Sequence, residues 1–129
     1  MFDISEVGKN VKNQDNRMTS NPMYCVQVKI RDVGYDANYG DDFCWWNAGQ
    51  LETVYDEPEN LTGWEKFGYK DRWETVMVAF TEKGCEEYLA LNGHNDMRKA
   101  HNGEIRIYAE SFNRCPEMIG IREYLISKA

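Results

Sequence analysis

The feature that most constrains the fold is a strand–helix–strand–helix pattern between residues 73 and 125. Apolar side chains fall on both faces of residues 73–80, WETVMVAF. Because side chains alternate across a strand, this pattern predicts a strand that is covered on both sides. Thr81 is a typical helix N-cap, and Asn92-Gly93 is a typical helix end. A helix is therefore expected between them.

The second half of this pattern predicts another strand and another helix. Residues 105–110, IRIYAE, alternate between apolar and polar side chains, as a half-buried strand does. Pro116 suits the first turn of a helix, where its missing N–H is not needed. Met118, Ile121 and Leu125 then form one apolar stripe at helical spacing. The helical crossover between the two strands allows them to form a parallel pair, right-handed if they share a sheet.

The chain before residue 73 supplies the rest of the sheet. Residues 23–31 alternate as an amphipathic strand, and short strands are expected at 43–46 and 50–55. A loop is expected at 61–72, with Gly63 and Gly68 as hinge points. We therefore predict an α+β fold with a sheet of about four to five strands and two C-terminal helices packed on it. Residues 1–22 are expected to form a polar arm with a short helical turn near Phe2–Val7, and residues 23–129 a single domain.

We expect a cytoplasmic protein that folds without disulfides or metal. The 129 residues are 42% hydrophobic, which suffices for a core without disulfides or metal. No apolar run is long enough to span a membrane, and the first 22 residues have no apolar signal core. The four cysteines form no CxxC pair, so we expect free thiols. Two disulfides in a secreted protein are the alternative.

The distribution of charge is unusual between residues 32 and 65. This stretch has nine acidic residues and no Lys, Arg or His, so it carries −9 while the remaining residues carry +2. Aromatic residues are interleaved with the acids: Tyr35, Tyr39, Phe43, Trp45, Trp46, Tyr55 and Trp64. Clustered like charges repel one another, so they cost stability unless a cation or a basic partner compensates them.

This stretch is the best candidate for a binding surface. Carboxylates can take the place of phosphates in the basic groove of a nucleic-acid-binding protein, and exposed rings can supply the strongest contacts. The partner-binding candidates are Tyr35, Asp36, Asp41, Asp42, Trp45, Trp46, Asp56, Glu57 and Glu59. Alternatively, the rings form the core and the acids lie on solvated loops. The negative charge argues against direct binding of nucleic acid, since phosphates would be repelled.

Other chemistry is poorly supported by the sequence. Residues 36–42, DANYGDD, fail the EF-hand register because glycine and aspartate fall at the wrong positions, so no metal and no cofactor are expected. Two further alternatives remain open. One is a small nucleotide-binding protein or enzyme with a pocket near His94, Arg106 and Tyr108. The other is a homo-oligomeric structural module, such as a homodimer.

The C-terminal half resembles a family of small phage and prophage accessory proteins. The matching segments are KGCEEYLALNGHN at Lys83–Asn95, RIYAES at Arg106–Ser111 and NRCPEMIGIREYL at Asn113–Leu125. The family has no agreed activity, so the resemblance assigns no site. It implies a phage-borne gene, whose small acidic products often disarm host defence. We therefore expect a non-enzymatic inhibitor of a CRISPR or restriction complex, acting in the bacterial cytoplasm on a basic, nucleic-acid-binding host protein.

Overall fold

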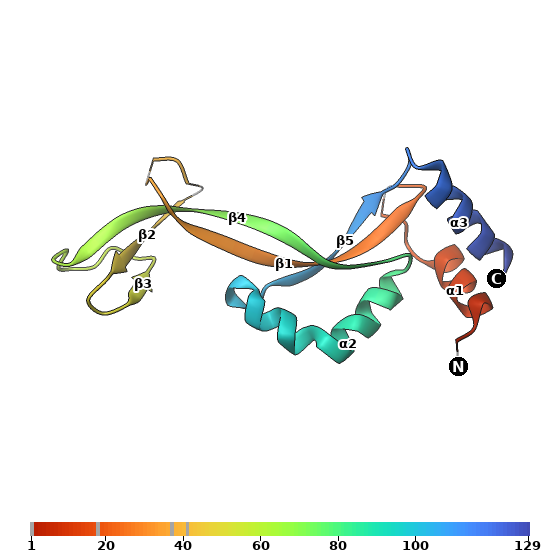
Figure 1. Ribbon diagram of the computed structural model, residues 1–129, viewed down its shortest axis with the longest axis horizontal. Coiled ribbons are helices and arrows are strands. Elements are labelled where there is room, and N and C mark those ends of the chain that lie inside the picture. The colour runs from red at the N-terminus through yellow and green to blue at the C-terminus, as the bar shows by residue number, and fades with distance from the viewer. Residues whose placement is uncertain (1, 18, 37, 41) are drawn as a thin grey trace. The chain divides into compact units, whose positions relative to one another are not determined.

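The computed structural model describes residues 2–17, 19–36, 38–40 and 42–129. In this part of the chain it contains three α-helices, one 3₁₀ helix and five strands (Figure 1). Their bounds, in chain order, are α1 Ile4–Asn13, β1 Pro22–Tyr35, β2 Asp42–Asn47, β3 Glu52–Val54, β4 Trp64–Ala79, α2 Glu82–Lys99, η1 His101–Gly103, β5 Ile105–Ser111 and α3 Pro116–Ser127. The predicted α+β class is confirmed, with two of the helices in the C-terminal half.

The five strands form one antiparallel sheet in the order β3-β2-β4-β1-β5. Strand β1 pairs with β5 from Pro22↔Ser111 to Val28↔Ile105, and β2 pairs with both β3 and β4. The parallel pair that the crossover allowed does not form, because β1 lies between β4 and β5. The crossover through α2 thus skips one strand.

The chain divides into two compact units. The first consists of Met1–Val28 and Glu74–Ala129, and the second of Lys29–Trp73. Strands β1 and β4 are long enough to contribute residues to both units. We call the first unit the helical unit and the second the strand unit.

The core of the helical unit lies between the sheet and α2. Tyr24 and Val26 of β1 and Cys85 of α2 are fully buried together. Ile105, Ile107 and Ala109 of β5 pack against this cluster, as the alternation of β5 predicts. Burial raises the pKa of the Cys85 thiol to about 11, so the thiol stays protonated and behaves as a small apolar side chain.

Strand β4 begins earlier than the sequence indicated. The predicted loop at 61–72 is wrong, because Trp64–Tyr69 pair with Asn47–Asp42 of β2. Gly68 suggested a hinge, but its position is explained by a close approach of backbone. A Cβ atom at Gly68 would lie 2.6 Å from the carbonyl oxygen of Asp36. Glycine inside a strand permits such an approach.

Helix α2 continues beyond the predicted stop at Asn92-Gly93 and ends at Lys99. The Asn92 side chain donates to the carbonyl oxygen of Tyr88, one turn earlier, instead of ending the helix. The left-handed residues that reverse the chain are Asn102 and Gly103, with φ of 54° and 68°. A second Asn-Gly dipeptide, ten residues after the first, therefore reverses the chain after α2.

The N-terminal residues contain a longer helix than the expected turn. Asp3 caps α1 by accepting a hydrogen bond from the Ser5 backbone N–H at 2.9 Å. Val11 is only 1% exposed, and α1 packs on α3 (Figure 1). Gly8 lies against the Leu125 carbonyl oxygen. Glycine at this position allows the two helices to approach closely.

Candidate functional site

The aromatic residues of the acidic stretch differ in exposure. Trp45 is 9% exposed and belongs to the core of the strand unit, and Trp46 is half-buried. Tyr35, Tyr39, Phe43 and Tyr55 are exposed at 40%, 74%, 37% and 43%. Trp45 therefore serves as core, while these four rings remain accessible at the surface.

The predicted carboxylates fall into two groups. Asp36 and Asp42 are exposed, but each accepts a hydrogen bond from a nearby backbone N–H, at 3.0 and 2.9 Å. Asp56, Glu57 and Glu59 are exposed in the loop between β3 and β4, and none forms an ion pair with the described residues. Asp41 lies outside the described residues.

Cations that flank the acidic stretch in sequence are drawn to particular acids. The Arg31 guanidinium donates to both carboxylate oxygens of Asp71, at 2.7 and 2.8 Å, and Lys29 lies 3.5 Å from the same carboxylate. These contacts hold the pKa of the Asp71 carboxyl below its ordinary value. Arg72 pairs with Asp32 at 2.9 Å. Three of the five cations of the strand unit are thus engaged by two carboxylates.

The remaining two cations lie over aromatic rings. The Lys66 ammonium lies 3.7 Å from the centre of the Phe43 ring, and the Lys70 ammonium lies 5.0 Å from that of Tyr35. Arg31 also stacks on Tyr69, at 3.9 Å from the ring centre. These cation–ring contacts show that some of the aromatic residues in the strand unit hold its cations in place.

A shorter segment keeps an uncompensated charge. Residues 51–65, which we call the acidic segment, include β3 and the loop that leads into β4. This segment has five exposed acids with no ion pair to the described residues: Glu52, Asp56, Glu57, Glu59 and Glu65. Leu51 and Leu61, exposed at 77% and 46%, lie in the same segment and were not among the predicted contacts. In the sequence, each is a single leucine beside turn residues, and a single leucine does not indicate whether the side chain is exposed.

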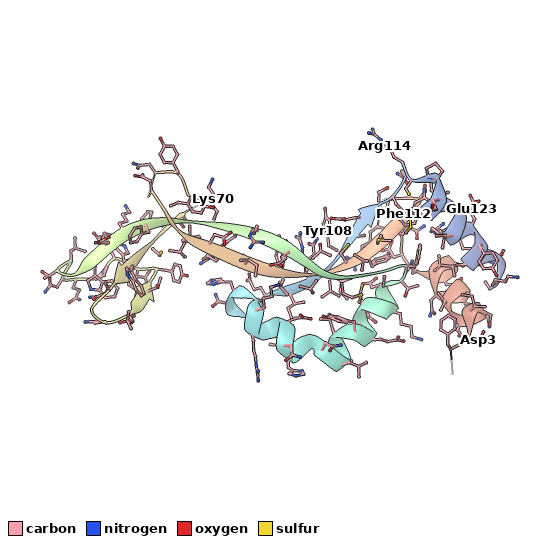
Figure 2. The ribbon with its side chains drawn as sticks, in the orientation of Figure 1. Asp3, Lys70, Tyr108, Phe112, Arg114 and Glu123 are labelled. Atoms are coloured by element: carbon pink, nitrogen blue, oxygen red, sulfur yellow. The ribbon has the colours of Figure 1, made fainter. Side chains whose placement is uncertain are left out.

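The alternative pocket near His94, Arg106 and Tyr108 is not assembled. Arg106 and Tyr108 lie on the face of β5 opposite to Ile107, whose face packs against α2. Figure 2 shows Tyr108 on the side of the sheet away from α2. His94 is an exposed residue of α2 itself. The sheet therefore separates the histidine from the other two residues.

The helical unit has a cavity of about 270 Å³ between α1 and the start of α2, lined by Phe2, Asp3, Glu6, Lys83 and Glu87 among others.

Within the described ranges, no group of three or more His, Cys, Asp or Glu residues could hold a metal ion. No helix in the described part of the chain is long and apolar enough to cross a membrane.

In comparisons with known proteins, no family model, curated protein or solved structure matches this chain. The resemblance to phage accessory proteins therefore stays a prediction.

Proposed function

We propose that this protein is a non-enzymatic inhibitor of a host defence complex, of the anti-CRISPR or anti-restriction type. Its acidic segment binds a basic surface that the partner uses for nucleic acid. One observation carries this proposal: the cations of the strand unit are engaged by other groups, and the five acids of residues 51–65 form no ion pair with described residues. An external basic surface would supply the missing counter-charge.

The chemistry of the segment suits such a partner. Each carboxylate can meet an Arg or Lys that otherwise contacts phosphate, and charge complementarity speeds association and aligns the two surfaces. The exposed leucines, Leu51 and Leu61, add apolar area beside the charges. Removal of these side chains from water on binding would favour association, with the charges around them.

The test compares two charge-matched variants. In the first, Asp56, Glu57 and Glu59 are replaced by lysine; in the second, the exposed acids Glu86, Glu87 and Glu123 of the helical unit are replaced in the same way. Both variants change the net charge equally. We expect the wild type and the second variant to capture the partner from a host lysate and to compete with DNA for the purified partner. We expect the first variant to do neither.

Two outcomes contradict the proposal. One is that the variant with lysines at 56, 57 and 59 captures the same partner and competes as well as the wild type. The other is that the captured partner binds the protein and DNA at the same time. Far-UV circular dichroism and thermal unfolding show whether each variant is folded.

A further inference from the structure

Strand β5 has an open edge. It is the last strand in the order β3-β2-β4-β1-β5, so in the described residues β1 is its one paired neighbour. An unpaired strand edge presents N–H and C=O groups that can pair with another strand. Whether this edge can accept one depends on which residues direct these groups outward.

The register of β5 on β1 identifies those residues. One step beyond the Pro22↔Ser111 pair, the backbone N–H of Phe112 donates to the carbonyl oxygen of Asn21 at 3.0 Å. In an antiparallel ladder, hydrogen-bonded and non-hydrogen-bonded pairs alternate. The even-numbered residues of β5 therefore bond to β1. The odd-numbered residues, Ile105, Ile107, Ala109 and Ser111, direct their N–H and C=O groups to the open edge.

The charges of β5 are complementary to those of a second, antiparallel β5. If a two-fold axis passes through Tyr108, Arg106 of each copy lies opposite Glu110 of the other, and Ile107 lies opposite Ala109. This register pairs outward-directed residues with one another, as hydrogen bonding requires. It also uses all seven residues of the strand, since Tyr108 is the middle one. Within the strand, axes through Ile107 or Ala109 pair no opposite charges, and an axis through Ile107 brings Glu110 opposite Glu104, the residue before the strand.

We propose that a second copy of this chain binds along the open edge of β5, antiparallel and centred on Tyr108. The surface is distinct from the acidic segment, so this inference does not depend on the proposed function. The side chains of Arg106, Tyr108 and Glu110 lie at non-hydrogen-bonded positions, where facing Cα atoms are closest. Two ion pairs and one tyrosine pair then line the face of the extended sheet that is opposite to α2.

Arg17 regulates access to this edge. Its guanidinium donates to the outward carbonyl oxygen of Ile107 at 3.2 Å and pairs with Glu82 of α2. A second β5 needs that carbonyl, so Arg17 must release it on pairing. A charged side chain at a strand edge is a common protection against unwanted strand pairing. We therefore expect Arg17→Ala to strengthen self-association of the full chain.

The decisive test mixes two single variants. Arg106→Glu places Glu opposite Glu in the self-pair, and Glu110→Arg places Arg opposite Arg. We expect each variant alone to sediment as one chain of 15.1 kDa. In an equimolar mixture, each Glu faces an Arg, and we expect about twice that mass. The proposal is overturned if the wild type stays monomeric up to its solubility limit, if either variant dimerises alone, or if the mixture stays monomeric.

A second variant keeps the test decisive if Arg106→Glu fails to fold, since Arg106 also bonds to Gln27 at 2.8 Å. Tyr108→Cys, in a Cys25→Ser, Cys115→Ser background, places two cysteines opposite each other on the axis. Their Cα atoms then lie within the range that a disulfide spans. Cys25 is replaced because it lies on β1 facing residue 108 and could form a disulfide within one chain. We expect mild oxidation to yield a covalent dimer for Tyr108→Cys but not for Glu110→Cys in the same background. Equal yields for the two variants contradict the register.

Discussion

At the scale of single residues, the contacts of Arg31 show how the strand unit accommodates its charges. Arg31 is 14% exposed in its side chain, stacks on Tyr69, and binds Asp71 through two hydrogen bonds. Planar guanidinium groups suit this combination of stacking and bidentate binding better than lysine does. A half-buried cation thus supports both the aromatic packing and one carboxylate.

Replacing Asp71 by asparagine leaves Arg31 without its counter-charge. We expect Asp71→Asn to lower the free energy of unfolding by about 2–3 kcal/mol at pH 7, because the pair is largely buried. Folding lowers the pKa of the Asp71 carboxyl below its ordinary value of 3.8. The Asp71 carboxylate therefore stabilises the folded protein fully when the pH is well above 3.8. The effect is lost as the pH falls through the lowered pKa. The difference between the two proteins should therefore disappear in acid.

Urea unfolding of both proteins from pH 7 to the acid limit of folding measures this effect. Asp32→Asn is the matched control, because the Asp32–Arg72 pair is exposed at 41% and 54%. Exposed pairs contribute about 0–1 kcal/mol. A loss for Asp71→Asn that is no greater than that for Asp32→Asn would contradict the structural role of the Arg31 cluster.

At the scale of helices and strands, α1 and α3 depend on a close approach at Gly8. We expect Gly8→Ala to cost about 1–3 kcal/mol, because the new Cβ atom would overlap the Leu125 carbonyl oxygen. Gly120→Ala in α3 is the control, since a Cβ there meets no atom within 4 Å. It should stabilise the protein by about 0.5–1 kcal/mol, as alanine favours a helix interior. Thermal unfolding of both variants tests this, and equal shifts would contradict the packing.

The elements that sequence predicted well are those with local signals. The alternation in residues 105–110 and the proline at 116 correspond to β5 and the start of α3. The start of β4 at Trp64 was missed because it depends on pairing with β2, and its Gly68 looked like a hinge. The helix end at Asn92-Gly93 was wrong because α2 runs through both residues to Lys99, and neither of them takes the left-handed backbone conformation that ends a helix.

The candidate site was predictable only in outline. A stretch without cations could be recognised from sequence, but the roles of Lys66 and Arg31 could not, since both lie outside it. The strands bring these cations beside Phe43 and Asp71. The burial of Trp45, at 9% exposure, likewise depends on the arrangement of the strand unit.

At the scale of the whole molecule, the net charge of −7 is unequally divided. The strand unit has ten acidic and five basic residues, a net charge of −5, and the helical unit has twelve and ten, a net charge of −2. Such an imbalance directs a basic partner toward one part of the protein and speeds association at low salt. The proposed function therefore predicts binding that depends strongly on ionic strength.

The most direct measurement is the dissociation constant of the purified complex with its captured partner as salt is raised. For the wild type, and for the variant with lysines at 86, 87 and 123, we expect affinity to fall steeply with salt because screening weakens the contacts of Asp56, Glu57 and Glu59. We expect the variant with lysines at 56, 57 and 59 to bind at least tenfold more weakly, a loss of about 1.4 kcal/mol or more. An affinity that is independent of salt, or equal in all three proteins, would contradict the claim that the acidic segment carries the binding.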